Sequence, residues 1–217
     1  MDFYFAPLAC SMATRIALYE LDAKADYIYV DIHTDPDARL LADGSDYHAI
    51  NPMGQVPAIR TDTGEMLTEN PVVLQYVADL HPQSGLAPSG GIERYHLLQW
   101  LNFIGTELHK ATYIPLLNSS NPAGAKEFAR KKLPLRMSYL SSHLATRDFM
   151  LERFSVADCY LVTVLNWSAA AGIDLAAWPV ITAYYDRLRQ RPSVARAIAD
   201  ERPIYTAEME RKRPAAA

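Results

Sequence analysis

The sequence predicts an α+β chain of two domains, a small mixed sheet with helices followed by an all-helical domain. The first 81 residues alternate between strand-like and helix-like patterns, in the order βαβ and then ββα. A stretch rich in Pro, Gly and Ser follows at residues 82–91, and no convincing strand pattern occurs beyond it. The expected division is therefore a first domain at 1–81, a linker at 82–91 and a helical domain at 92–217.

The first half of the N-terminal domain has the pattern of strand, helix and strand. Residues 2–5 (DFYF) form a short aromatic run that is typical of a strand, and residues 6–9 predict a loop. From Ser11 onward apolar residues recur at helical spacing, and residues 27–30 (YIYV) again resemble a strand. This order predicts two parallel strands joined by a crossover helix.

The second half of that domain has the pattern of strand, strand and helix. Residues 33–46 are polar and predict turns, whereas the apolar runs at 56–60 and 66–67 flank a turn and predict an antiparallel hairpin. Residues 71–80 then carry helical spacing. Proline is favoured at the first helical position that Pro71 occupies, and Asn70 is placed to cap this helix.

Helical patterns fill the rest of the chain. They begin near Ile92, Ala123, Ser155, Trp178 and Ser193, and they are broken at Pro115, Asn121–Pro122, Gly172, Pro179 and Pro192. Ser155 and Asp158 have the spacing of a capping box, in which a serine and an acid three residues later satisfy each other's backbone groups. The last residues, RKRPAAA, predict a disordered tail.

Composition and charge argue against several classes of partner. The formal net charge is −4 and the basic runs at 130–132 and 211–213 are short, so no nucleic-acid partner is expected. No apolar run approaches the ~20 residues of a membrane span, and the N-terminus lacks the order of a signal peptide. A cytoplasmic chain with reduced thiols at Cys10 and Cys159 is therefore expected.

Cys10 is the first candidate for chemistry, because it lies between a strand with its loop and the start of a helix. Backbone N–H groups and the helix dipole favour a thiolate there, although a free cysteine is often a small buried hydrophobe instead. A dithiol oxidoreductase would carry a second cysteine where Ala13 stands, so only monothiol chemistry remains. Cys159 lies within an apolar helical run and is expected to be inert core.

Other candidates each have a plainer interpretation. Val56–Pro57 opens a predicted strand, and its peptide bond is either an ordinary trans bond or a rarer cis bond. A cis bond would turn the backbone groups of Val56 outward, where they could pair with an extended peptide. Glu69 and Asn70 either form a helix cap or bind the charged end of an amino acid. His109 is a lone histidine, and no His, Cys, Asp or Glu cluster has metal-ligand spacing, so no metal is expected.

Eight segments carry a family resemblance when they are taken in order. They are YFAP with ACS at residues 4–11, AINPMGQVPA at 49–58, LTE at 67–69, QYVAD at 75–79, ERYH at 93–96, WLNF at 100–103, ELHK at 107–110 and SVAD at 155–158. The chain resembles the cytosolic glutathione transferases over about residues 1–205, and most closely their Beta class. Cys10 together with ELHK points to that class, whereas N-P-x-G-Q-V-P at 51–57 and S-x-A-D at 155–158 mark the wider superfamily.

The resemblance implies a fold, a co-substrate and an assembly. The expected fold is a thioredoxin-like domain followed by an all-α helical bundle, the expected co-substrate is glutathione, and the expected assembly is a homodimer. Pro57 would follow a cis bond and Val56 would pair with the cysteinyl backbone of glutathione. Glu69 and Asn70 would hold its γ-glutamyl end. Cys10 would lie close to its sulfur, able to form a mixed disulfide.

The remaining implied roles fall on both domains. Ser11 and His109 would surround the sulfur with Cys10, and Tyr4 is a competing sulfur ligand. From the helical domain, Lys110 would also face the cleft, with Asn102 and Trp167 along the same wall. Beta-class relatives often hold the glycyl carboxylate with a lysine in the loop after the second strand. Here that loop contains Asp35, so His33 or Arg39 is expected to substitute.

Three functions remain as hypotheses. The leading one is transfer of glutathione to small hydrophobic electrophiles, because stabilising its thiolate makes the attack feasible at neutral pH. The second is glutathione-dependent thiol and disulfide exchange, or reductive removal of a halide or an aryl ether, with Cys10 as a covalent nucleophile. The third is a non-catalytic ligand-binding or regulatory protein of the same fold.

Overall fold

A computed structural model describes residues 1–32, 34 and 38–212 of the chain. Contacts divide the chain into two compact units. The first comprises Met1–Val77 together with the chain from Pro192 onward, and the second comprises Ala78–Arg191. The C-terminal segment therefore groups with the first unit rather than with the helical one, which differs from the expected range of 92–217.

The first unit is built on one mixed sheet of five strands in the order β3-β2-β1-β4-β5. The strands are β1 (Asp2–Phe5), β2 (Asp26–Asp31), β3 (Leu40–Leu41), β4 (Ala58–Arg60) and β5 (Met66–Thr68). The β1 and β2 strands are parallel, β1 and β4 are antiparallel, and β4 and β5 form the hairpin. These pairings confirm the expected βαβ and ββα halves.

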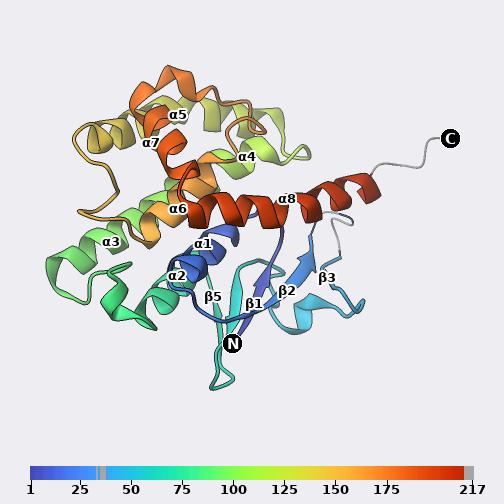
Figure 1. Cartoon of the computed structure of the whole chain (residues 1–217). Coiled ribbons are helices and arrows are strands. Elements are labelled where there is room, and N and C mark those ends of the chain that lie inside the picture. Colours follow the sequence, from blue (N-terminus) through green and yellow to red (C-terminus); the bar gives the residue numbers. More distant parts are fainter. Residues whose placement is uncertain (33, 35–37, 213–217) are drawn as a thin grey trace. The chain divides into compact units, whose positions relative to one another are not determined.

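Three helices complete the first unit, namely α1 (Met12–Glu20), α2 (Asn70–Asp79, which ends in the second unit) and α8 (Pro192–Lys212). In Figure 1 the red α8 runs beside the blue α1, and the two helices pack together. Apolar residues fill both α1 and β1, so that Phe3, Ile16 and Leu18 are fully buried. Burial of such side chains is the main favourable contribution to folding.

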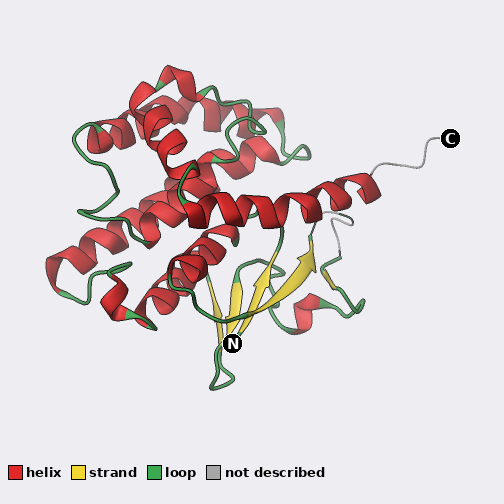
Figure 2. Cartoon of the chain, in the orientation of Figure 1, coloured by secondary structure: helices red, strands yellow, loops and turns green. Residues whose placement is uncertain are grey.

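The second unit contains only helices, as Figure 2 shows by the colour of its elements. They are α3 (Gly91–Phe103), the π-helix η3 (Ile104–Tyr113), α4 (Ile114–Leu117), α5 (Ala123–Leu144), α6 (Val156–Leu165) and α7 (Pro179–Arg189), with short 3₁₀ turns at Pro82–Ser84 and Leu175–Ala177. All ten residues of α6 are buried. A helix that is buried on every side belongs in a core, and α6 packs against α3, η3 and α7.

The predicted capping box at the start of α6 is present. The Ser155 backbone N–H donates to Asp158 Oδ2 at 2.9 Å, and the Ser155 hydroxyl donates to the same oxygen at 3.0 Å. Asp158 Oδ1 also accepts from the Met150 amide at 2.8 Å and the Tyr184 hydroxyl at 2.7 Å. This fully buried carboxyl therefore joins α6 to α7 and to the loop before it.

Several elements differ from the sequence prediction. The polar region at 33–46 contains the two-residue strand β3, and a 3₁₀ turn follows at Tyr47–Ala49. The helix expected at 71–80 begins one residue earlier, at Asn70. Across residues 1–32, 34 and 38–212, no helix combines the length and the apolar character that a membrane crossing needs.

Candidate functional site

Cys10 lies in the turn between β1 and α1 and is partly exposed. Its thiol donates to the backbone carbonyl of Val56, with 3.0 Å between Sγ and oxygen. The amides of Met12 and Ala13 donate to the carbonyls of Ala9 and Cys10, so they are used within the turn. The positive end of the dipole of α1 favours negative charge near Cys10.

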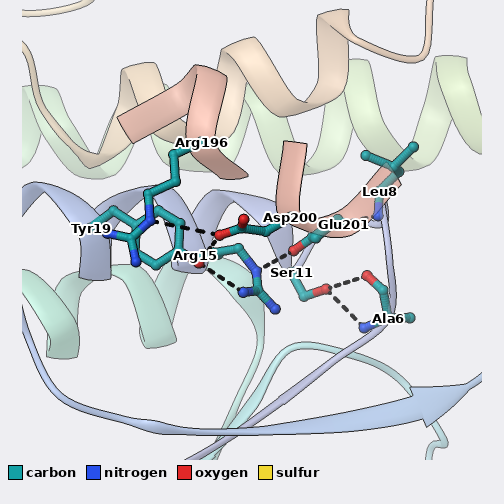
Figure 3. A network of polar contacts seen from close by, with 8 residues as sticks. All are labelled: Ala6, Leu8, Ser11, Arg15, Tyr19, Arg196, Asp200 and Glu201. Atoms are coloured by element: carbon teal, nitrogen blue, oxygen red, sulfur yellow. Dashed lines mark hydrogen bonds and ion pairs between the residues drawn. The ribbon is translucent and has the colours of Figure 1, made fainter. Parts of the chain in front are cut away.

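The Ser11 hydroxyl closes the loop before Cys10. It donates to the Ala6 carbonyl at 3.0 Å and accepts from the Ala6 amide at 3.2 Å, as Figure 3 shows. Ser11 is fully buried. Its observed role is thus to fix the shape of the loop, and the expected role beside the glutathione sulfur stays a prediction.

The same loop is tied to the C-terminal helix by a buried ion pair, which we call the Arg15–Glu201 pair. Arg15 Nε lies 2.6 Å from Glu201 Oε1, and Glu201 Oε2 accepts the Leu8 amide at 2.6 Å (Figure 3). The Arg15 guanidinium also lies 4.3 Å from the ring centres of both Phe5 and Tyr27. Burial raises the pKa of Glu201 to about 7, against the opposing effect of Arg15.

Val56 and Pro57 are joined by a cis peptide bond, as the resemblance implies. Val56 is buried in a cluster that also contains Tyr4 and Tyr47. The Tyr47 hydroxyl donates to the Gln55 carbonyl at 3.0 Å, which holds the chain just before this bond. Burial raises the pKa of Tyr47, and the nearby Tyr4 and Cys10 add to the effect.

Tyr47 was not predicted as a site residue, because in the sequence it is a single aromatic residue just after the polar stretch 33–46. Tyr4, the expected alternative sulfur ligand, is 4% exposed, and its ring centre lies 5.6 Å from that of Tyr47. The observed role of Tyr4 is therefore packing in this cluster. A role for its hydroxyl beside the sulfur stays a prediction.

Glu69 and Asn70 stand at the start of α2. Glu69 is exposed and has a left-handed backbone with φ of 66°, and its carbonyl accepts from the amides of Val72 and Val73. The Asn70 side chain is 5% exposed, and its Nδ2 donates to the Cys10 carbonyl at 3.1 Å. Its Oδ1 has no hydrogen-bond partner among the described residues. The expectation that Asn70 caps α2 is therefore wrong, because a cap would use that oxygen.

Arg39 lies beside the turn that precedes Val56. Arg39 Nη1 donates to the Ala38 carbonyl at 2.7 Å, and a Cβ at Gly54 would lie 3.0 Å from Arg39 Cγ and 2.7 Å from His48 Nε2. The other ring nitrogen of His48 lies 2.8 Å from Asp46 Oδ1. His48 stands in no recognisable motif and was therefore not predicted as a site residue. His33 and Asp35 lie outside the described residues.

His109 lies in the π-helix of the second unit and is 3% exposed. Its Nδ1 lies 2.7 Å from the Tyr160 hydroxyl, and its ring centre is 5.0 Å from that of Trp167. Burial lowers the pKa of His109 to about 3, with the charge of Lys110 as a smaller cause. The imidazole is therefore neutral at neutral pH and can hydrogen-bond without carrying charge.

The other candidates of the second unit have different surroundings. Lys110 and Asn102 are exposed, and Asn102 Nδ2 donates to the Leu98 carbonyl one helical turn earlier at 2.8 Å. Trp167 is 9% exposed and packs on the rings of His109 and Tyr113. Their contact with a substrate stays a prediction. Across the described part of the chain, no three His, Cys, Asp or Glu residues gather as a metal site requires.

Comparisons with known proteins cover both units. Residues 9–80 match the family model of the glutathione S-transferase N-terminal domain, and residues 103–192 match that of the C-terminal domain. The chain is 37% identical over 203 residues to glutathione S-transferase GstA of Escherichia coli O157:H7. That match covers 93% of this chain and 98% of the relative.

Solved structures are similar over the same extent. A sphingomonad glutathione S-transferase complexed with glutathione is 42% identical, with a TM-score of 0.86. The bacterial beta class glutathione S-transferase of Sphingomonas chungbukensis is 41% identical, with a TM-score of 0.85. Each match covers 93% of this chain and 98% of the other. The similarity thus extends over nearly the whole of both chains.

Proposed function

The chain belongs to the glutathione S-transferase family, and from this premise we propose that it transfers glutathione to small hydrophobic electrophiles. The motif resemblance, including that to the Beta class, agrees with this membership. The single observation that carries the proposal is the hydrogen bond from the Cys10 thiol to the carbonyl oxygen of Val56, with 3.0 Å between sulfur and oxygen. A peptide that pairs with the Val56 backbone thereby brings its own thiol to Cys10.

The proposed reaction begins with the thiol of glutathione, which is a weak nucleophile while it is protonated. Cys10 stands just before α1, where the positive end of the helix dipole favours a thiolate. The glutathione thiol gives its proton to solvent, its thiolate sulfur attacks the electrophile, and the leaving group departs as the new carbon–sulfur bond forms. The protein contributes orientation and stabilisation of negative charge, which are the effects that accelerate such a step.

Both charged ends of the tripeptide have proposed partners in the first unit. Glu69 offers an exposed carboxylate to the ammonium group of the γ-glutamyl residue, next to the start of α2. Arg39 is the proposed partner of the glycyl carboxylate, since guanidinium–carboxylate hydrogen bonds are charge-assisted. His48 lies beside the same turn and is proposed to support it.

Several further roles and properties expected from the family resemblance stay predictions. The roles of Ser11, Tyr4 and His33 near glutathione are predictions, as are those of four residues in the second unit, namely Asn102, His109, Lys110 and Trp167. A homodimer, a cytoplasmic location and the absence of a resident metal also stay predictions. Glutathione as co-substrate is supported by the relatives, one of which is described as complexed with it.

Calorimetry and a conjugation assay test the proposal together. We expect heat on addition of glutathione and formation of the conjugate with a chlorinated dinitrobenzene. Replacing Arg39 with Gln should weaken glutathione binding at least about tenfold, because a charge-assisted hydrogen bond contributes roughly 1.5–3 kcal/mol. Absence of both heat and conjugate in the wild-type protein would refute the proposed function.

A Cys10→Ala variant separates conjugation from redox chemistry. Conjugation should survive at least in part, because the thiol that attacks belongs to glutathione. Exchange between glutathione and a disulfide should disappear, because Cys10 is the only partly exposed thiol among the described residues. Loss of all conjugation with glutathione binding intact would instead make Cys10 a covalent participant.

A further inference from the structure

Two buried side chains, Tyr47 and Asn51, converge on one backbone oxygen, the carbonyl of Gln55. The Tyr47 hydroxyl donates to it at 3.0 Å, and Asn51 Nδ2 donates to it at 2.7 Å. Tyr47 is fully buried and Asn51 is 5% exposed, whereas Gln55 is exposed. The two donors therefore hold this carbonyl from the interior of the first unit. A carbonyl oxygen has two lone pairs, so two donors satisfy it completely.

Both donors are themselves held in place. The Tyr47 amide donates to the Arg39 carbonyl at 2.8 Å, and its ring centre lies 5.6 Å from that of Tyr4. Asn51 Oδ1 accepts from the Met53 amide at 3.1 Å. Because a backbone N–H can only donate and a carbonyl can only accept, these bonds fix the orientation of the Asn51 side chain. Both hydrogen bonds to the Gln55 carbonyl thus come from side chains with a defined position.

The direction of the Gln55 carbonyl determines that of the Val56 amide. The bond between the two residues is trans, so the C=O and the N–H of this planar peptide group point in opposite directions. The Val56 carbonyl accepts from the Cys10 thiol at 3.0 Å, whereas the Val56 amide donates to no acceptor within residues 1–32, 34 and 38–212. A backbone N–H needs a partner, so this amide pairs with solvent or with a ligand.

Resting on the proposed function, we infer that Tyr47 and Asn51 are positioning residues for glutathione. By holding the Gln55 carbonyl inward, they keep the Val56 amide turned toward the ligand, whose own backbone carbonyl it meets. Both residues act through the peptide group between Gln55 and Val56 and do not touch glutathione themselves. Because Val56 also contacts the Cys10 thiol, the orientation of this peptide group sets where the sulfur of the ligand lies relative to Cys10.

Two conservative substitutions each remove one donor. Tyr47→Phe removes only the hydroxyl. Asn51→Asp keeps the oxygen that accepts from the Met53 amide, but it presents a second oxygen to the Gln55 carbonyl in place of a donor. Circular dichroism checks that each variant folds. Asn51→Ser replaces Asn51→Asp if the latter does not fold, and it should raise the Kd for glutathione at least about threefold at every pH.

Tyr184→Phe is the matched control for the loss of a buried hydroxyl. Tyr184 is buried in the second unit, and its hydroxyl donates to Asp158 Oδ1 at 2.7 Å. A hydrogen bond to a carboxylate contributes more than one to a carbonyl, so this variant should lose at least as much unfolding free energy as Tyr47→Phe. An effect on glutathione that occurs only in Tyr47→Phe therefore does not come from a general loss of stability.

Steady-state kinetics with a chlorinated dinitrobenzene and calorimetry with glutathione measure the positioning. Tyr47→Phe should raise the KM and the Kd for glutathione about three- to tenfold, the range expected for one hydrogen bond. Its kcat at saturating glutathione and its KM for the electrophile should stay within about twofold of wild type, because only glutathione binding is weakened. Tyr184→Phe should change none of these quantities. Equal KM and Kd values for glutathione in wild type and Tyr47→Phe would refute the role of Tyr47.

Asn51→Asp adds a pH dependence that a merely structural role would not produce. Its carboxylate repels the Gln55 carbonyl, whereas the protonated acid has an O–H that donates to it. At pH 8 its Kd for glutathione should exceed that of wild type at least about tenfold. This ratio should fall at least about threefold by pH 5, because burial beside a carbonyl oxygen favours the protonated acid. The corresponding ratio for Tyr47→Phe should stay constant, since phenylalanine does not titrate. A constant ratio for Asn51→Asp would refute the role of Asn51.

The inference and the proposed function fail in different ways. If wild-type protein neither binds nor conjugates glutathione, the proposed function is wrong. Amide hydrogen exchange in the ligand-free protein, followed by NMR, still tests the orientation of Val56. Its amide should exchange at least about tenfold faster than that of Gly54, which donates to the Asn51 carbonyl at 2.8 Å. Equal protection of the two amides would overturn the inference. If wild type binds glutathione and Tyr47→Phe behaves as Tyr184→Phe does, only the role of Tyr47 is wrong.

Discussion

His109 is a histidine that the folded chain keeps neutral. Its Nδ1 meets the Tyr160 hydroxyl at 2.7 Å, and burial lowers its pKa to about 3. An unfolded histidine titrates near 6.5. Between these values the unfolded chain binds a proton that the folded chain does not, so the free energy of unfolding falls as the pH drops from about 6.5 toward 3.

Removing this histidine should therefore flatten the acid side of the stability profile. His109→Gln keeps a hydrogen-bonding group for Tyr160 but cannot titrate. Urea unfolding should show that wild type loses roughly 2 kcal/mol more than the variant between about pH 6.5 and 4.5. His143→Gln is a useful comparison, because burial lowers the pKa of His143 as well but less strongly. Parallel profiles for wild type and His109→Gln would show that His109 is not the group responsible.

At the scale of single residues, the sequence predicted which residues belong to the site better than it predicted their contacts. The motif resemblance assigned Cys10, Val56 and Pro57 to one site, and the cis bond agrees with that assignment. The hydrogen bond from Asn70 to the Cys10 carbonyl could not be predicted, because the two residues lie 60 positions apart and no periodic pattern links them. Capping was the simplest interpretation of an asparagine at the start of a helix.

Helix α6 depends on its first turn. The Asp158 carboxyl accepts from Ser155, from the Met150 amide and from the Tyr184 hydroxyl, and all of these bonds are buried. Ser155→Ala should reduce the free energy of unfolding by about 0.5–2 kcal/mol. Asp158→Ala should cost more, because it also leaves buried donors unpaired.

Urea unfolding near neutral pH measures both effects. The control is Asp174→Ala, since Asp174 accepts from the Ala176 amide at the start of a short exposed turn. That variant should lose less than about 1 kcal/mol. If Asp158→Ala were no more costly than Asp174→Ala, the capping box would contribute little to the stability of α6.

A second prediction at the scale of elements concerns how α1 and α8 are held together. Breaking a buried ion pair by removing one partner leaves an uncompensated charge, so Glu201→Ala should cost about 3–5 kcal/mol. The neighbouring Asp200 is exposed, and its carboxylate lies 3.7 Å from Arg196 Nε. Asp200→Ala should therefore cost less than about 1 kcal/mol. Equal losses of unfolding free energy in the two variants would contradict this assignment.

The sequence predicted the helices and strands whose apolar residues recur at regular spacing. It did not predict the elements that lack such a pattern. The parallel pair, the hairpin and helices α1 and α2 all follow from apolar spacing and turn residues. The two-residue strand β3 is too short to leave a pattern. The π-helix at Ile104–Tyr113 was also missed, because its sequence carries ordinary helical spacing and only the bonding pattern differs.

At the scale of the whole molecule, contacts group the C-terminal helix α8 with the first unit, whereas the sequence grouped it with the helical domain. The sequence placed residues 192–217 with the helical domain, since a helix that follows other helices gives no sign of where it packs. Arg15 and Glu201 are 186 positions apart, and their ion pair is a long-range contact that local patterns do not encode. The first unit is therefore completed by the last helix of the chain.

Removal of that helix should therefore damage the first unit. A chain that ends at Arg191 loses Glu201, the partner of both Arg15 and the Leu8 amide. Arg15 would remain as a charge without its partner beside Phe5 and Tyr27. Because the Leu8 amide lies in the loop that leads to Cys10, glutathione binding should be lost together with the stability of the sheet.

A chain that ends at Lys212 is the control, because it keeps all of α8. Calorimetry with glutathione and urea unfolding followed by circular dichroism compare the two truncations with the full chain. The longer truncation should abolish binding and lower the free energy of unfolding by several kcal/mol, as expected when a buried ion pair loses one partner. The shorter one should change neither quantity measurably. Full glutathione binding by the chain that ends at Arg191 would show that α8 covers the first unit without supporting the Cys10 loop.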